Sequence, residues 1–199
     1  MKFTSPLAAM ALALPLMAGA LPALAHANDT YASASLNTSA VAPITTAEVE
    51  AAQRAWGDAL VAISTEYERN GQEAAKRLAG QVIDAAYGYD LGPVAFKPTL
   101  AAAPQTFRTT REGALAYFVG GDARFAADTG FALKSWRAYE IDNAAIVING
   151  TTAISTGNVM FTNADGVVTT VDKTWGYVRD AEGKLRIVLH HSSLPYSAN

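Results

Sequence analysis

Apolar residues recur at steps of three and four between Val49 and Tyr67, which predicts a buried stripe on one long helix. Thr45 precedes this stripe and Glu48 follows three residues later, a spacing typical of the capping box at a helix start. The pair Asn70-Gly71 ends the pattern, since glycine tolerates the left-handed conformation of a helix C-cap. We therefore expect the ordered domain to begin at Thr45 with a long amphipathic helix.

Two shorter helices are predicted further along the chain. Residues 73–87 have helical spacing, with Gly80 as a candidate break, and residues 110–119 form a second helical segment that glycines terminate. Between them, residues 94–98 have an extended pattern, and Pro98 restricts this segment to the edge or the end of a sheet. The first half of the domain is thus predicted to be mainly helical.

Segments rich in β-branched and aromatic residues dominate the second half of the chain. They are separated by pairs typical of hairpin turns, which are Asn149-Gly150, Asp165-Gly166 and Glu182-Gly183. The predicted strands cover residues 130–143, 145–149, 152–162, 167–179 and 185–193. Helices followed by consecutive antiparallel hairpins indicate an α+β domain with its helices on one face of the sheet.

The first 44 residues have a different character. Lys2 is the only charged residue before Asp29, an apolar run covers residues 7–24, and Ala25-His26-Ala27 provides small residues at a cleavage site. Residues 1–27 are therefore predicted to be a signal peptide, and residues 28–44 a flexible leader. An uncleaved membrane anchor is the alternative, but prolines interrupt the apolar run. One domain, 45–199, then remains, in the periplasm or secreted.

Composition excludes several classes of protein. The formal net charge of −3 becomes more negative after loss of Lys2, which argues against nucleic acid and anionic membrane as partners. The chain has no cysteine, so no disulfide supports the exported domain. No phosphate-binding glycine loop, dinucleotide motif or nucleophile elbow occurs.

A zinc site with three histidine ligands is excluded by count, and a site with two is disfavoured by strand geometry. After cleavage only His190 and His191 remain, and adjacent residues of a strand point to opposite faces of its sheet. Glu140, Asp142 and Asp172 could serve a harder ion, but their positions have no ligand spacing signature.

Polar residues gather at the end of the last predicted strand. Alternation places His190 and Ser192 on one face, and His191 and Ser193 on the other. Whichever face is turned inward therefore presents one histidine and one serine. Strand ends are often polar, so solvated or capping residues are the alternative interpretation of this run.

Five segments of the chain resemble the iota class of carbonic anhydrases. They are Phe96-Lys97-Pro98-Thr99, residues 116–121, 128–136 and 173–178, and residues 183–196, which end in His-His-Ser-Ser-Leu-Pro-Tyr. This class belongs to the NTF2-like superfamily and is related to the association domain of calcium/calmodulin-dependent kinase II. The resemblance implies a cone, in which N-terminal helices pack on a strongly curved antiparallel sheet, and it covers the chain from Thr45 to Tyr196.

The resemblance also implies an activity, the reversible hydration of CO2 to bicarbonate. In this family, the positions of Thr99, Tyr117, His190 and Ser192 surround the bicarbonate. Some members are described as needing manganese and others as free of metal; the shortage of ligands in this chain favours the form without a cofactor. Leu189 stands where the family often has a further histidine.

Two other functions remain open at this point. The kinase association domain uses the same cone for assembly, so a noncatalytic binding or oligomerisation module is one alternative. An isomerase or dehydratase of the wider superfamily is the other, with Asp142 or His190 as its base. Cone domains commonly pair through the outer face of the sheet, so we expect a homodimer.

Overall fold

The computed structural model describes residues 41–198, so the predicted signal peptide and most of the predicted leader lie outside the described residues. The elements are, in chain order, α1 (Thr46–Asn70), α2 (Gln72–Ala86), β1 (Ala95–Lys97), α3 (Arg111–Val119), the 3-10 turns η1 (Ala123–Phe125) and η2 (Phe131–Leu133), β2 (Trp136–Asn149), β3 (Thr152–Asn163), β4 (Val168–Arg179) and β5 (Leu185–Ser193). Within this range, none of the helices has the length and apolar character required to cross a membrane.

The strands form one sheet in the order β1-β5-β4-β3-β2. The four long strands pair antiparallel through three hairpins, whereas β1 pairs parallel with β5 at the sheet edge. Pro98 directly follows β1, as the edge assignment requires. The predicted α+β fold with a meander of antiparallel hairpins is therefore confirmed.

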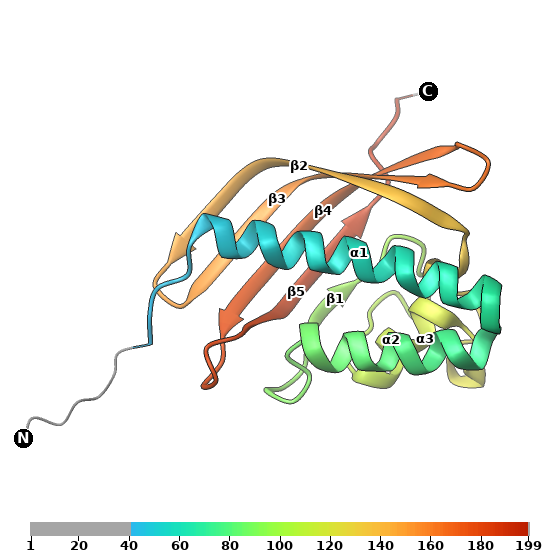
Figure 1. Ribbon diagram of the computed structural model, residues 1–199, viewed down its shortest axis with the longest axis horizontal. Helices are drawn as coiled ribbons and strands as arrows, with labels where there is room; N and C mark the ends of the chain where they lie inside the picture. The colour runs from blue at the N-terminus through green and yellow to red at the C-terminus, as the bar shows by residue number, and fades with distance from the viewer. Residues whose placement is uncertain (1–40, 199) are drawn as a thin grey trace, which may run out of the picture. The chain divides into compact units, whose positions relative to one another are not determined.

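Helix α1 lies across one face of the sheet, and α2 and α3 lie together near β1 and β5 (Figure 1). The start of α1 has the predicted capping box, in which the Thr45 side chain and the Glu48 side chain each accept a hydrogen bond from the other residue's backbone. The apolar stripe of α1 is buried from Val49 to Ile63. Helix α2 continues through Gly80, so the expected candidate break is absent.

Strand β2 differs from the sequence prediction. Residues 131–133 form a 3-10 turn, and the strand starts at Trp136 rather than at residue 130. It then runs without interruption to Asn149, with a bulge between Asn143 and Ala145 where two separate strands were expected. The Asn143 and Gln53 side chains exchange two hydrogen bonds of 2.8 Å, which tie the bulge to α1. In the sequence, a bulge looks like the end of a strand, because the alternation of apolar and polar residues is interrupted there.

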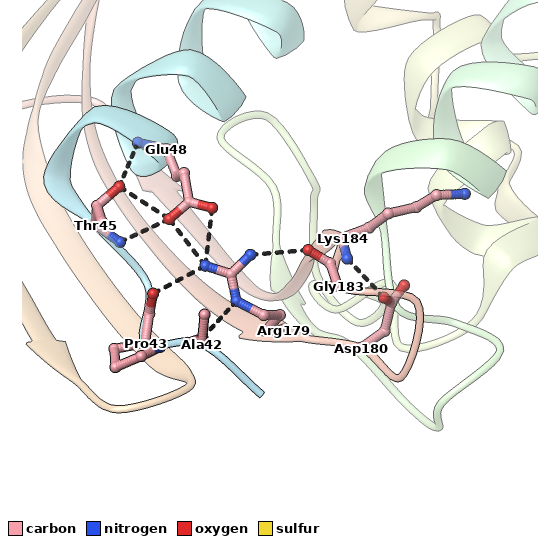
Figure 2. A network of polar contacts seen from close by, with 8 residues as sticks. All are labelled: Ala42, Pro43, Thr45, Glu48, Arg179, Asp180, Gly183 and Lys184. Carbon is pink, nitrogen blue, oxygen red and sulfur yellow. Dashed lines mark hydrogen bonds and ion pairs between the residues drawn. The ribbon is translucent and has the colours of Figure 1, made fainter. Parts of the chain in front are cut away.

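The start of α1 is held to the β4–β5 hairpin by Arg179 (Figure 2). Its guanidinium donates to the Glu48 carboxylate over 2.8 Å and to the backbone oxygens of Ala42, Pro43 and Gly183. These hydrogen bonds to Arg179, followed by those to Thr45, lower the pKa of the Glu48 carboxyl. The contact fixes the helix that carries Trp56 over the sheet.

A buried ion pair organises the loops beside β1. Arg108 and Asp128 form two charge-assisted hydrogen bonds of 2.9 and 2.7 Å, and both side chains are only 2% exposed. Arg108 also donates to the backbone oxygens of Gln105 and Phe107. Because its own backbone N–H pairs with Phe96, the ion pair joins β1 to the loop that follows α3.

We expect Asp128→Ala to reduce the free energy of unfolding by about 3–5 kcal/mol, because it leaves the buried guanidinium without a counter-charge. Chemical denaturation monitored by circular dichroism measures the change. Asp122→Ala is the matched control, since it removes an exposed pair with Arg124 in the same loop and should leave the unfolding midpoint almost unchanged. Equal midpoints for the two variants would contradict the structural role of the pair.

Candidate functional site

The end of β5 turns one histidine and one serine into the domain. His190 is 2% exposed and Ser192 is 1% exposed, whereas His191 lies on the solvent side. The pairing expected from strand alternation is therefore confirmed, and solvated residues are excluded for this face. The adjacent histidines point in opposite directions, as predicted.

Five buried side chains form a continuous series of hydrogen bonds, which we call the buried polar chain. The Trp56 indole donates to the Tyr87 hydroxyl over 2.9 Å, and this hydroxyl lies 2.8 Å from Nδ1 of His190. On the other side of the ring, Nε2 of His190 lies 2.6 Å from Nζ of Lys173. The Lys173 amine donates to the Ser192 hydroxyl over 2.8 Å. None of the five residues is more than 4% exposed.

Aromatic rings enclose the imidazole of His190. The Phe96 ring stacks on it with centroids 4.2 Å apart, and the Trp56 ring meets it edge-on at 5.6 Å. Burial, followed by the proximity of Lys173 and His191, lowers the pKa of His190 well below its usual value. Each ring nitrogen already has a protein partner, so the imidazole has no free nitrogen in this arrangement.

Lys173 is buried without a counter-charge. Among the residues described, no Asp or Glu lies within ion-pair distance of its amine. The rings of Trp56 and Trp175 lie 4.4 and 5.2 Å from Nζ, a contact that stabilises a desolvated cation by about 2 kcal/mol. Removing an ammonium from water costs several kcal/mol. Burial therefore lowers the pKa of Lys173 well below its usual value.

Lys173 and Tyr87 are members of the site that were not predicted from the sequence. A signal for Lys173 was present, because it alternates with Val171 and Trp175 on the buried face of β4. A lysine in such an apolar stripe is unusual, since lysine is almost never fully buried unless it is paired. Tyr87 had no comparable signal: it lies at the C-cap of α2, and its contact with His190 joins residues distant in the chain.

Thr99 and Tyr117 form a second pair at the site. Tyr117 lies on α3 and is 5% exposed, and Thr99 follows β1 by two residues. Burial raises the pKa of the Tyr117 hydroxyl, although its hydrogen bonds with Leu100 and Thr99 act in the opposite direction. The hydroxyl therefore stays protonated and can donate. A cavity of about 20 Å³ lies beside Tyr117, enough for about one water.

Phe96 connects the two pairs. Its ring stacks on His190 at 4.2 Å and meets the Tyr117 ring edge-on at 5.7 Å. Two of the four expected residues, His190 and Tyr117, therefore contact one aromatic side chain of β1. A larger recess of about 630 Å³, lined by Asp84 and Arg186 among others, contains none of the four.

The carboxylates considered from the sequence lie away from this site. Glu140, Asp142 and Asp172 are exposed, and Asp172 accepts a hydrogen bond from Asn158 on the neighbouring strand. The expectation that Asp142 could be the inward base of an isomerase or dehydratase is therefore wrong, because β2 turns this side chain to solvent. Between residues 41 and 198, no group of three or more His, Asp or Glu residues could hold a metal ion.

The chain is similar to proteins of known class. Residues 47–194 match the family model described as metal-independent carbonic anhydrase. The metal-independent carbonic anhydrase of Nostoc sp. (strain PCC 7120 / SAG 25.82 / UTEX 2576) is 65% identical over 153 residues, which are 77% of this chain and 75% of that protein.

Solved structures give a similar result. The crystal structure of a cyanobacterial iota-carbonic anhydrase complexed with bicarbonate is 63% identical, covers 78% of this chain and 95% of that chain, and has a TM-score of 0.78. A putative calcium/calmodulin dependent protein kinase II association domain from Xanthomonas campestris is 22% identical over 76% of this chain and 88% of that chain, with a TM-score of 0.49. The family match and the close relatives confirm the resemblance found in the sequence: this chain belongs to the family of metal-independent carbonic anhydrases.

Proposed function

We propose that this chain hydrates CO2 reversibly to bicarbonate without a metal, at the side chains of Thr99, Tyr117, His190 and Ser192. The observation that supports this site most directly is the burial of His190 and Ser192 on one face of β5. The bicarbonate-bound relative supports the substrate class. The family description as metal-independent supports catalysis by the side chains alone.

Hydroxyl donors supply the main stabilisation in this mechanism. When the water oxygen attacks the carbon of CO2, negative charge develops on the CO2 oxygens. The hydroxyls of Thr99, Tyr117 and Ser192 donate to these oxygens, as the donors of an oxyanion hole do. Such donors act strongly here because aromatic rings exclude water and lower the local dielectric constant.

His190 takes part through the buried polar chain rather than as a direct base. Its nitrogens are occupied by Tyr87 and Lys173, so the attacking water has no lone pair on the ring to which it could give a proton. We assign the proton to solvent, which the cavity beside Tyr117 admits. Phe131 lines this cavity, and its apolar ring suits uncharged CO2.

We expect Ser192→Ala to lower kcat/KM for CO2 hydration by about 10²–10³-fold, because it removes one donor to the developing charge. Stopped-flow measurement with a pH indicator, on protein treated with a chelator, gives the rate. Ser193→Ala is the matched control, since this neighbour lies on the opposite face of β5 and should leave the rate unchanged. Full activity in Ser192→Ala would contradict the proposed site.

Tyr117→Phe is expected to lower kcat/KM by about 10²-fold while the fold is retained, since only a hydroxyl is lost. The raised pKa of Tyr117 means that the wild-type hydroxyl remains a donor throughout the neutral and mildly alkaline range. Wild-type activity should therefore show no loss from tyrosine ionisation below about pH 10. Tyr67→Phe, on the solvent side of α1, is the control. An unchanged rate in Tyr117→Phe would remove this residue from the site.

We further propose that the mature protein begins at Asn28, acts in the periplasm or outside the cell, and forms a homodimer. The apolar run and the small residues of the cleavage site support export. Val147 and Ile154 support pairing through the sheet, because they are register partners on adjacent strands and are 63% and 52% exposed.

Mass spectrometry of the periplasmic fraction should give a chain that starts at Asn28. Light scattering of the purified protein should give the mass of a dimer. Ala27→Phe should leave the precursor uncut, because the cleavage site requires a small residue, whereas Ser35→Phe in the leader should be processed normally. An uncut wild-type chain, or a monomer at all concentrations, would refute the corresponding part of this proposal.

A further inference from the structure

The buried polar chain imposes a direction on its own hydrogen bonds. Trp56 can only donate, so the Tyr87 oxygen accepts from the indole. Within residues 41–198, the only acceptor near the Tyr87 hydroxyl hydrogen is Nδ1 of His190, 2.8 Å away. A buried hydroxyl without an acceptor is costly, so Tyr87 donates to Nδ1.

This direction determines the tautomer of His190. If Nδ1 accepts from Tyr87 and the ring is neutral, the proton of the imidazole resides on Nε2. Nε2–H then points at the Lys173 amine nitrogen, 2.6 Å away, which must accept it. An ammonium has three donors and no lone pair, so only an uncharged amine completes the series.

The two alternative arrangements each leave the Tyr87 hydroxyl hydrogen without an acceptor. A charged Lys173 would donate to Nε2 and force the proton to Nδ1, where it would face the Tyr87 oxygen. A neutral Lys173 that donates one hydrogen to Nε2 would require the same tautomer, while its second hydrogen goes to the Ser192 oxygen. In both cases the Tyr87 hydroxyl hydrogen has no acceptor among the described residues.

We propose that Lys173 is an uncharged positioning residue, which accepts Nε2–H of His190 and donates to the Ser192 oxygen, so that the Ser192 hydroxyl hydrogen is directed to a substrate oxygen. The inference rests on the proposed role of Ser192 in CO2 hydration. Its structural part, the state of His190 and Lys173, stands independently of that role.

The surroundings of Lys173 are consistent with this state. His190 and Ser192 face the amine from β5, Trp175 from β4 and Trp56 from α1, and Tyr87 faces the far side of the imidazole. Neither an acidic side chain nor a second lysine is in contact with the amine among these groups. Burial favours the uncharged form.

Nitrogen NMR of the mature chain, labelled at histidine and lysine, tests the resting state directly. Only His190 and His191 are present after cleavage, so a His191→Gln variant assigns the spectrum. We expect a neutral His190 with the proton on Nε2, and an uncharged Lys173, at neutral pH. An imidazolium, a proton on Nδ1 or an ammonium at Lys173 would overturn the proposal.

Lys173→Met tests the positioning role, since it keeps the length of the side chain and removes the amine. We expect kcat/KM for CO2 hydration to fall about 10–100-fold. We also expect the chemical shift of Nε2 of His190 to change, because its hydrogen bond to the amine is lost. Lys184→Met, at the exposed β4–β5 turn, is the control and should match wild type. Wild-type activity in a folded Lys173→Met variant would refute the role.

Tyr87→Phe provides a second test if Lys173→Met does not fold. Removal of the donor to Nδ1 should allow His190 to populate both tautomers, and kcat/KM should fall to a smaller extent. A single, unchanged tautomer in Tyr87→Phe would show that Tyr87 does not set the direction. Activity in Ser192→Ala would instead refute the proposed site and leave the NMR result standing, so the two failures are distinguishable.

Discussion

The position of Trp56 is the constraint on which the rest of this domain depends. Its indole packs against Phe118, Phe161 and Trp175, so one side chain of α1 contacts both α3 and the sheet. The same indole donates to Tyr87 and thereby starts the buried polar chain. Core packing and the buried polar chain are thus coupled, because a displacement of α1 from the sheet would remove both the aromatic contacts and the hydrogen bond of Trp56.

This coupling explains how polar groups are tolerated in an aromatic core. Five buried side chains form a continuous series of hydrogen bonds, which reduces the free-energy penalty of burying their polar groups. None of the five side chains is a carboxylate. A low dielectric constant then strengthens the hydroxyl donors that face the substrate in the proposed mechanism.

The topology brings together residues from both ends of the domain. Strand β1 comes early in the chain but pairs parallel with β5, so that Phe96 lies opposite His190 in register. Helix α3 then adds Tyr117 on the other side of Phe96. The Arg108–Asp128 ion pair holds the loops that connect these elements. Most of the site therefore depends on contacts between segments distant in sequence.

The sequence by itself determined the helices, the hairpins and the pairing of one histidine with one serine on each face of β5, because periodicity, capping residues and turn glycines act locally. It also carried the family resemblance, which named Thr99, Tyr117, His190 and Ser192. It could not predict that β2 passes through a bulge, since the bond between Asn143 and Gln53 spans distant segments. Only the tertiary structure placed Tyr87 and Lys173 beside His190. A hydrogen bond between side chains distant in the sequence produces no periodic pattern, so the contacts of Tyr87 and Lys173 with His190 were decided by tertiary packing.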